Sequence, residues 1–291
     1  MNRRTRAEVF LLLVTLIWGS TFVVTKYVLR DAGPFLYTLI RFLVASFIFG
    51  IVFFSRLRNI GKESATKGAI LGFLLFIGFA TQTVGLLYTT ASKSAFITGM
   101  MVVFTPICQL LIERRPPKFG NLFGVALVMA GLYFLTSPTG SHFNLGDGLT
   151  LICALSFAIY IVCLDIFSQN CDEMHLTFMQ FAVTAGLAGF AYLFFENFRL
   201  IVSLEFTLGV IYLAIFATVI ALFVQARFQK DTTPTRSAVV FSVEPVIAAV
   251  AAYLVLGERL GEYGILGGGL IVAGVVVSEF SDTLFKAYGA D

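Results

Sequence analysis

The sequence predicts an all-α membrane protein: ten transmembrane helices arranged as two inverted five-helix repeats, with both termini cytoplasmic. Composition predicts the class, because 58% of the 291 residues are hydrophobic and only 13% are charged, whereas soluble domains carry about 25% charged residues. The mean hydropathy of +0.91 agrees with this assignment. The apolar runs are continuous rather than alternating, which indicates helices and not a β-barrel. An internal repeat and the distribution of basic residues predict the arrangement and the orientation.

Ten apolar runs are long enough to cross a bilayer, whose core of about 30 Å needs about 20 helical residues. The first run follows Arg3, Arg4 and Arg6 and has no small-residue cleavage pattern, so we interpret it as a retained helix rather than a signal peptide. Breaks are expected at Pro106 and Pro245, in the fourth and ninth spans. The predicted spans are residues 9–26, 35–54, 68–89, 94–112, 119–136, 148–167, 175–194, 206–228, 237–256 and 263–280.

The charged residues predict the orientation in the membrane, and together with the cysteines they argue against nucleic-acid binding and a bound cofactor. With the N-terminus inside, 14 of the 20 basic residues lie at inner loops and span ends, five lie at outer ones, and Arg41 lies within a span. Because cytoplasmic loops are rich in Lys and Arg, both termini are predicted cytoplasmic and the membrane is predicted to be the cytoplasmic one. The net charge of +3 includes no long basic run, which argues against nucleic acid as a partner. The four cysteines lack metal-ligand spacing, so we expect no cofactor.

An internal repeat relates the two parts of the chain. The segment Thr89–Ala95 (TTASKSA) returns as Thr232–Ala238 (TTPTRSA), with four identities and two conservative changes at an offset of 143. Gln82 falls on Gln225 at the same offset. Weaker matches at offsets of 135 and 139 relate the first and second spans to the sixth and seventh. The repeat divides the chain into residues 1–137 and 138–291.

Each unit holds five spans, an odd number, so the second unit must enter the membrane upside down relative to the first. The charges agree independently, because Lys93 falls outside and its counterpart Arg236 falls inside. Inverted repeats of this kind serve alternating access, with a site near the bilayer midplane between the two halves.

Several motifs resemble the drug/metabolite transporter superfamily, and in particular its EamA type. They cover nearly the whole chain and include Ile17–Phe22 (IWGSTF), Arg41, Gly85–Ala91 (GLLYTTA), Ser94–Thr98 (SAFIT), Glu113-Arg114, Glu244-Pro245 and Leu256–Arg259 (LGER). The resemblance implies ten helices around a central cavity and the export or exchange of amino acids, metabolites or drugs. It implies no particular substrate. The intramembrane carboxylate of the four-helix multidrug members has no counterpart, because Glu8 lies at the membrane edge.

Ionisable groups within the membrane are the first candidate substrate-binding residues, since a charge at a helix centre costs about 2.5–3.5 kcal/mol on insertion scales. Arg41 lies in the second span and Glu244 in the ninth. Two kinds of role stay open. Both residues can be structural, as an ion pair with each other, or with Arg41 as an anchor on helix carbonyls and Glu244 as a local structural group. Alternatively, they bind the carboxylate and the amino group of a zwitterionic substrate. Glu244 is also a candidate proton carrier.

Five uncharged residues complete the candidate substrate site. Gln82 and Gln225 occupy equivalent positions in the two units, and their amides must face protein or a wet cavity. Trp18, the only tryptophan, lies about 15 Å into the first span, away from the interfaces that tryptophan favours. Tyr88 and Tyr160 are further candidates for the cavity wall. For each of these residues, packing in the protein interior is the alternative.

The predicted function is secondary transport of a small metabolite, such as an amino acid, by an exporter or exchanger. A passive channel or a lipid-translocating protein is the alternative, and no constellation of residues indicates an enzyme. The spacings Gly120-x-x-x-Gly124 and Gly264-x-x-x-Gly268 permit close packing of the fifth and tenth helices on each other, on a neighbour or in a homodimer. The sequence leaves monomer and homodimer open; the expected partners are the lipid bilayer and a small-molecule substrate.

The topology makes a direct prediction about accessibility. Single cysteines placed at Ser64 and Ser141 should react with a membrane-impermeant thiol reagent from opposite sides, with Ser141 outside, because an odd number of spans separates them. Labelling of both positions from the same side would contradict the inverted arrangement.

Overall fold

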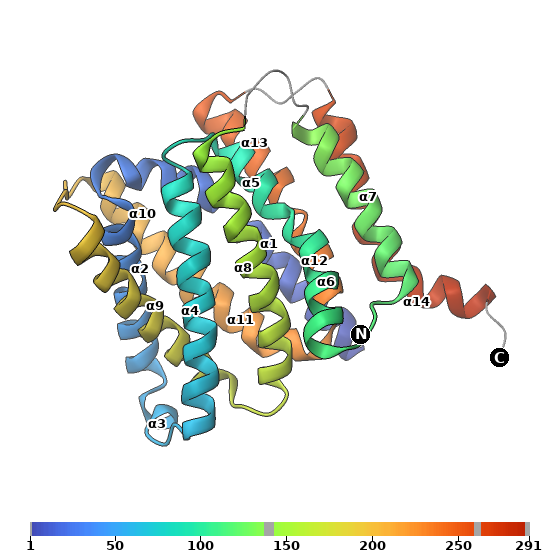
Figure 1. The fold of residues 1–291 in the computed structure, drawn as a ribbon, viewed down its shortest axis with the longest axis horizontal. Coiled ribbons are helices and arrows are strands. Elements are labelled where there is room, and N and C mark those ends of the chain that lie inside the picture. The colour runs from blue at the N-terminus through green and yellow to red at the C-terminus, as the bar shows by residue number, and fades with distance from the viewer. Residues whose placement is uncertain (1, 137–142, 259–262, 289–291) are drawn as a thin grey trace.

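The computed structural model describes residues 2–136, 143–258 and 263–288, which form a helical bundle (Figure 1). Ser141, the predicted outer labelling position, and Arg259 of the LGER motif lie outside the described residues. Within them, eight helices are long and apolar enough to cross a membrane, and two shorter apolar stretches cover residues 119–134 and 264–278. The protein is therefore all-α and crosses the membrane several times.

The helices follow the predicted spans closely, and six of those described begin after a residue whose side chain caps them. Asn144 and Asp147 form a reciprocal capping box at one start, and Asp172 and Ser203 cap two others. The elements are α1 (Arg3–Asp31), α2 (Pro34–Val52), α3 (Phe54–Leu57), α4 (Lys62–Gly85), α5 (Ala91–Gly99), α6 (Met101–Glu113), α7 (Phe119–Thr136), α8 (Leu145–Ser168), α9 (Glu173–Phe195), α10 (Leu204–Ala214), η1 (Ile215–Ile220), α11 (Ala221–Phe228), η2 (Gln229–Asp231), α12 (Pro234–Phe241), α13 (Glu244–Leu256) and α14 (Gly264–Tyr288).

Two spans are broken at matching places. The ninth divides into α12 and α13 just before Pro245, as expected, because proline suits the first turn of a helix. The fourth divides into α5 and α6 at Met100, and the expected break at Pro106 was wrong. Pro106 lies inside α6, where one missing hydrogen bond is tolerated in a packed bundle. A side chain at Gly99 would lie 2.9 Å from the Pro245 ring, so the two breaks meet each other.

The eighth span contains a wider turn that the sequence analysis did not anticipate. Between α10 and α11, Ile215–Ile220 forms a π-helix. The Thr218 hydroxyl donates to the Leu213 carbonyl at 2.8 Å within this turn. A π-turn displaces backbone carbonyls from the regular ladder, which leaves them free to accept other donors.

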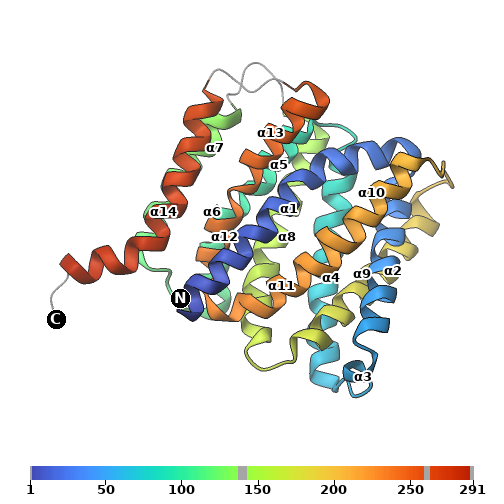
Figure 2. The same ribbon diagram turned by 180° about the vertical axis from the view of Figure 1, so that it is seen from behind.

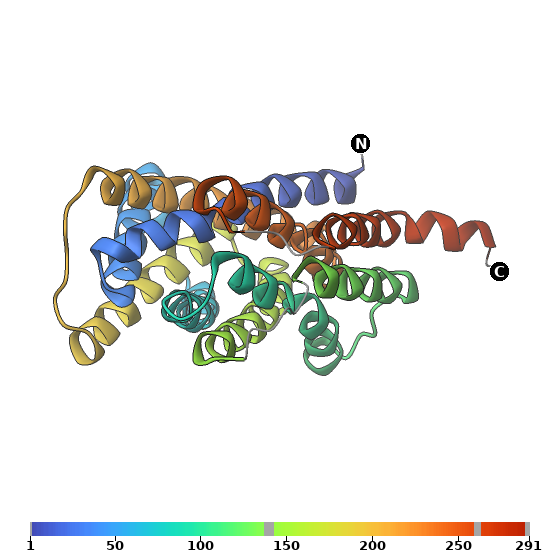
Figure 3. The ribbon, with the colours of Figure 1, turned by 90° about the horizontal axis from the view of Figure 1, so that it is seen from above.

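The two sequence halves are interleaved rather than side by side. Helix α4 packs against α8 and α9, α2 packs against α9, and α1 packs against α10, α11 and α13. Helix α1 runs from the end where the chain begins to the end where α13 finishes (Figure 2). Viewed from above, the molecule is elongated, with α14 extending at one end (Figure 3).

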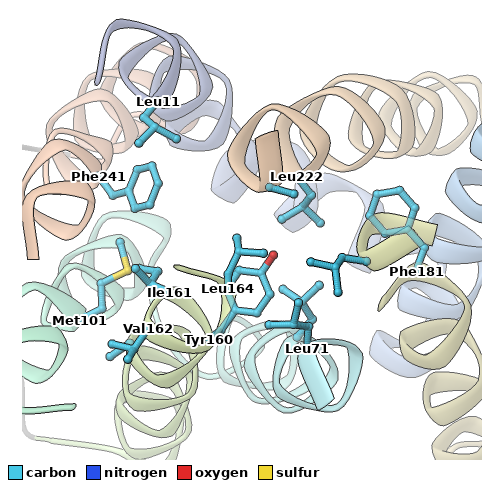
Figure 4. Packing of buried hydrophobic residues seen from close by; sticks show 14 of the residues in the cluster. Leu11, Leu71, Met101, Tyr160, Ile161, Val162, Leu164, Phe181, Leu222 and Phe241 are labelled. Carbon is cyan, nitrogen blue, oxygen red and sulfur yellow. The ribbon is translucent and has the colours of Figure 1, made fainter. Parts of the chain in front are cut away.

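Figure 4 shows part of the main buried apolar cluster, to which Tyr160 of α8, Leu222 of α11 and Phe241 of α12 contribute.

Polar contacts tie the far end of α1 to the start of α5. Glu258 accepts hydrogen bonds from the backbone N–H groups of Ala91 and Ser92 and from the Ser92 hydroxyl, and Lys26 lies 3.7 Å away. Burial by itself would raise the pKa of the Glu258 carboxyl, but the hydrogen bonds from Ser92 and Ala91, together with Lys26, lower this pKa below its usual value. Glu258 is therefore ionised at neutral pH and caps α5 as a carboxylate.

Helices α7 and α14 form a pair that packs mainly on each other and also contacts α5, α6 and α12 (Figure 1). The expected packing of the fifth helix on the tenth is present, but Gly124 is the one contact glycine described below that belongs to the two predicted spacings. A side chain at Gly124 would lie 2.8 Å from the Gly274 carbonyl, and one at Gly131 would lie 2.7 Å from the Gly267 carbonyl. Three of these four glycines lie outside the predicted spacings. The rotation of each helix about its own axis decides which glycines face the partner helix, and the spacing alone does not specify that rotation.

We predict that Gly274→Ala destabilises the α7–α14 pair. The added methyl group has to displace backbone, and overpacking of this kind typically costs about 1–3 kcal/mol. The measurement is the thermal midpoint of the detergent-purified protein. Gly269→Ala, on the same helix, is the matched control, because its methyl group would meet nothing within 4 Å. Equal midpoints for the two variants would contradict the close contact.

Candidate functional site

A narrow cavity lies between the helices at mid-depth. Its volume, measured as the space open to the centres of water molecules, is about 50 Å³. One water needs roughly 10–15 Å³ by this measure, so the cavity has room for a few waters in this conformation. The lining residues come from eight helices: Trp18 and Thr21 (α1), Arg41 (α2), Leu75, Phe79 and Gln82 (α4), Met101 (α6), Phe157, Tyr160 and Ile161 (α8), Leu222 and Gln225 (α11), Phe241 (α12) and Glu244 (α13).

Six of the seven predicted site residues lie around this cavity: Trp18, Arg41, Gln82, Tyr160, Gln225 and Glu244. Tyr88 does not. Helix α4 ends at Gly85, and Tyr88 lies in the turn beyond it with 55% of its surface exposed. Its backbone carbonyl accepts a hydrogen bond from the Asn144 side chain, which places it at the end of the bundle rather than at the centre.

The Arg41 guanidinium is buried and held by neutral acceptors. Its Nε donates to the Thr218 hydroxyl at 2.7 Å, and its terminal nitrogens donate to the Tyr37 hydroxyl at 3.0 Å and the Ala217 carbonyl at 3.4 Å. The guanidinium carbon lies 4.6 Å from the centroid of the Phe79 ring, a cation–π arrangement. In the part of the chain that the structure describes, no carboxylate lies within ion-pair distance of Arg41. Its charge is therefore oriented but not neutralised.

The π-turn provides acceptors for two cavity residues at once. The Trp18 indole N–H donates to the Ala217 carbonyl at 3.0 Å, the same carbonyl that Arg41 contacts. The Trp18 ring also packs edge-on against Phe241, with centroids 5.3 Å apart. Because both interactions depend on the carbonyl displaced in η1, this wide turn fixes the orientation of two cavity side chains.

Glu244 is the other ionisable residue of the cavity, and it begins α13 directly after the break in the ninth span. Only 7% of the residue is exposed. Among the described residues, its carboxylate has no hydrogen bond and no ion pair, so the direct pair with Arg41 considered from the sequence is not formed. Helix α1 approaches closely here, since a side chain at Gly19 would lie 3.1 Å from the Glu244 carbonyl.

The amide residues are engaged to different extents. The Gln82 amide donates to the Thr98 hydroxyl at 3.1 Å. The Tyr160 hydroxyl donates to the side-chain carbonyl of Gln180 at 3.0 Å. The Gln225 side-chain oxygen is buried and has no hydrogen-bond partner within the described part of the chain. An unused acceptor of this kind in a cavity wall is a ready contact for a ligand donor.

Four supporting residues were not predicted: Tyr37, Thr98, Gln180 and Thr218. Two of them carried a signal in the sequence. Tyr37 lies four residues before Arg41, on the same helix face. Gln180 is the counterpart of Arg41 at the repeat offset of 139. Thr218 carried no such signal, because its role depends on the π-turn.

Comparisons with known proteins agree with this architecture. The model of the EamA-like transporter family matches residues 5–137 and 144–280. The chain is similar to an uncharacterized transporter of Archaeoglobus fulgidus, 34% identical over 276 residues that cover 94% of this chain and 86% of the relative. It is also similar to a probable amino-acid metabolite efflux pump of Escherichia coli, 28% identical over 300 residues that cover 94% of each chain. A protein of known crystal structure matches with a TM-score of 0.79 over 99% of this chain and 100% of that one; at 18% identity this shows the fold alone.

The chain belongs to the EamA-like transporter family. It is a multi-pass membrane transporter and not an enzyme, as the sequence motifs indicated. The cavity at mid-depth, with two ionisable residues and aromatic walls, is the candidate substrate site of this transporter.

The absence of a direct ion pair predicts how two substitutions combine. The stability changes caused by Arg41→Met and Glu244→Gln should add to within about 0.5 kcal/mol, because the residues share no contact. The stability changes caused by Arg41→Met and Thr218→Val should not add, because each substitution removes one partner of the same hydrogen bond. Unfolding free energies in detergent test both cycles. Recovery of stability in the Arg41→Met/Glu244→Gln double variant would instead indicate a direct pair.

Proposed function

We propose that this transporter binds a small zwitterionic metabolite, of which amino acids are the main class, and exports it across the cytoplasmic membrane. The observation that carries the proposal is the cavity itself, which contains a guanidinium and a carboxylate that do not neutralise each other. The proposed substrate-binding residues are Trp18, Arg41, Gln82, Tyr160, Gln225 and Glu244.

The charges of the cavity define the complementary ligand. An uncompensated charge inside a membrane protein is costly and is usually functional. A substrate carboxylate would bind Arg41, which Thr218 and Tyr37 already orient. A substrate ammonium would bind Glu244, which lacks a partner of its own. A zwitterion supplies both groups in one small molecule, so it enters the cavity without adding net charge.

The uncharged lining residues suit the remainder of such a molecule. Trp18, Phe79, Phe157 and Phe241 give the cavity an aromatic wall that accepts an apolar side chain. The unused acceptor of Gln225 provides a further contact for the ammonium group. Since the cavity now has room for only a few waters, the aromatic side chains have to move when substrate enters.

We propose that transport uses alternating access by ten spans in two inverted units, residues 1–137 and 138–291, with both termini cytoplasmic. Two observations support this arrangement. Lys26 near the end of α1 and Asp147 at the start of α8 both lie beside the start of α5, so the first helices of the two units run in opposite directions. The broken fourth and ninth spans meet at Gly99 and Pro245, beside the cavity, where inverted-repeat transporters place discontinuous helices.

Export of an amino-acid metabolite is further supported by the Escherichia coli relative, whose name states that activity as probable. The alternative class, a passive channel or lipid-translocating protein, predicts a different kinetic behaviour. A channel would give unsaturable flux, whereas a cavity that binds one substrate at a time gives saturable counterflow.

We predict that purified protein in liposomes shows saturable counterflow of at least one zwitterionic amino acid. The same compound should change the emission of Trp18, the only tryptophan of the chain, because this side chain lines the cavity. An untargeted set of metabolites can therefore be screened by fluorescence before transport is measured. Unsaturable flux without an emission change would reject the proposal.

The charge assignments are tested with analogues of the compound found in this way. Removing its amino group should weaken binding to the native protein by about tenfold or more, the scale of one charged hydrogen bond, but should change little in Glu244→Gln. Removing its carboxylate should likewise weaken binding to the native protein but change binding to Arg41→Gln little. Glu63→Gln, an exposed change far from the cavity, is the control. If the loss of binding free energy caused by the analogue and the loss caused by the variant simply add, the assigned contacts do not exist.

A further inference from the structure

The repeated heptapeptides, Thr89–Ala95 and Thr232–Ala238, have no part in the cavity, yet they fold in the same way. Each begins a short helix, α5 or α12. The second threonine of each caps its helix: Thr90 and Thr233 accept a hydrogen bond from the backbone N–H three residues later. Three further polar positions of each segment contact partners on the opposite half of the chain: Thr89, Ser92 and Lys93 in the first, and Thr232, Thr235 and Arg236 in the second.

At the start of α5, Lys93 and Thr89 hold Asp147. The Lys93 ammonium lies 2.7 Å from one carboxylate oxygen of Asp147, and the Thr89 hydroxyl donates to the other oxygen at 3.0 Å. Asp147 lies in the first turn of α8, which is the first long helix of the second half. We name these three residues the α5–α8 clamp.

At the start of α12, Arg236 and Thr232 hold Glu8 in the same manner. The Arg236 Nε lies 2.6 Å from Glu8 Oε1, and the Thr232 hydroxyl donates to that oxygen at 3.2 Å. Glu8 lies near the beginning of α1, the first helix of the first half. We name these three residues the α1–α12 clamp. Thr89 and Lys93 correspond to Thr232 and Arg236 at the offset of 143, so each half clamps the first helix of the other.

The fourth residue of each heptapeptide, Ser92 or Thr235, makes a further contact with the other half through its hydroxyl group. The Ser92 hydroxyl donates to Glu258, just beyond the end of α13, at 2.7 Å. Its counterpart Thr235 donates to the side-chain oxygen of Gln109, toward the end of α6, at 2.6 Å. The end of each broken span is thus bound to the start of the other, beside the respective clamp.

The two clamps lie at opposite ends of the bundle. Glu8 belongs to one clamp, and Lys26, on the same helix, lies 3.7 Å from the Glu258 that binds the start of α5. At 1.5 Å per residue, the 18 residues from Glu8 to Lys26 span about 27 Å, close to the core thickness of a bilayer. Trp18 of the cavity lies between them. The cavity therefore has one clamp toward each membrane face.

We propose that the α5–α8 clamp and the α1–α12 clamp are the two gates of the cavity, and that they open in alternation. This inference rests on the proposed transport function. Substrate reaches the cavity from one face only if the halves separate there, which breaks the clamp at that face. The other clamp stays formed and keeps the opposite face closed.

The position of the charges suits this role. At a membrane face, the separated ammonium or guanidinium and carboxylate become hydrated as the gate opens, which offsets the loss of their attraction. At mid-depth no such compensation is available, and there the protein leaves Arg41 and Glu244 for substrate. Both clamps are formed in this structure, and the cavity is correspondingly narrow.

Quenching of Trp18 fluorescence by iodide tests the proposal without a substrate. Iodide does not cross the bilayer, so it is added outside uniformly oriented proteoliposomes or enclosed within them. Lys93→Gln should increase quenching from one side by about two- to fivefold, since loss of one clamp shifts the population toward the state open at that face. Arg236→Gln should produce the same increase from the other side. The expected result is that the two variants increase quenching from opposite sides, and this holds whichever side is cytoplasmic.

Glu63→Gln is the matched control, because the Lys67–Glu63 ion pair lies within one helix and joins no two halves; quenching should stay at the native value from both sides. If Arg236→Gln fails to fold because the buried Glu8 loses its closer charged partner and keeps the more distant Arg4, at 4.0 Å, Glu8→Gln/Arg236→Gln removes both clamp charges and should act identically. Unchanged quenching in folded variants, or an equal increase from both sides, would overturn the gate assignment. Side-selective quenching in a protein that transports no zwitterion would instead reject only the proposed function.

Discussion

Inside a bilayer no water is available to hydrogen-bond an exposed backbone, so each irregularity in these helices has to be satisfied by the protein itself. The chain concentrates its irregularities around one cavity. The breaks of the fourth and ninth spans meet at Gly99 and Pro245, and the carbonyl displaced by the π-turn at Ala217 accepts from Trp18 and Arg41. The backbone irregularities and the candidate substrate site are therefore one feature of the molecule.

The same constraint separates two kinds of charge. Near the ends of the bundle, charges are neutralised directly, as in the pairs Lys93–Asp147 and Arg236–Glu8. At mid-depth, Arg41 is surrounded by neutral acceptors and Glu244 by none, although both line one cavity. A direct pair between them would occupy the two groups that we propose bind a zwitterionic substrate. The structure therefore leaves both groups unpaired with each other inside the cavity.

Sequence reasoning located most of the cavity because the repeat and the cost of intramembrane polarity act at the level of single positions. Gln82 and Gln225 were found from their shared offset, and Arg41 and Glu244 from their charge within apolar spans. Tyr88 was chosen from residue type and depth alone, and it lies outside the cavity because α4 ends before it. Pro106 was expected to break its span, but the break follows Gly99, where the partner helix needs space.

The sequence by itself determined the helical class, the location of the spans, the repeat and the family, because hydropathy and internal similarity depend only on the order of residues. Only the tertiary structure decided which side chains meet. The Arg41–Thr218 contact depends on a π-turn, the α7–α14 contact on the rotation of two helices, and the partners of Lys93 and Arg236 on how the halves interleave. Each of these joins positions more than 50 residues apart, and no local pattern specifies a distance between helices that are not neighbours in sequence.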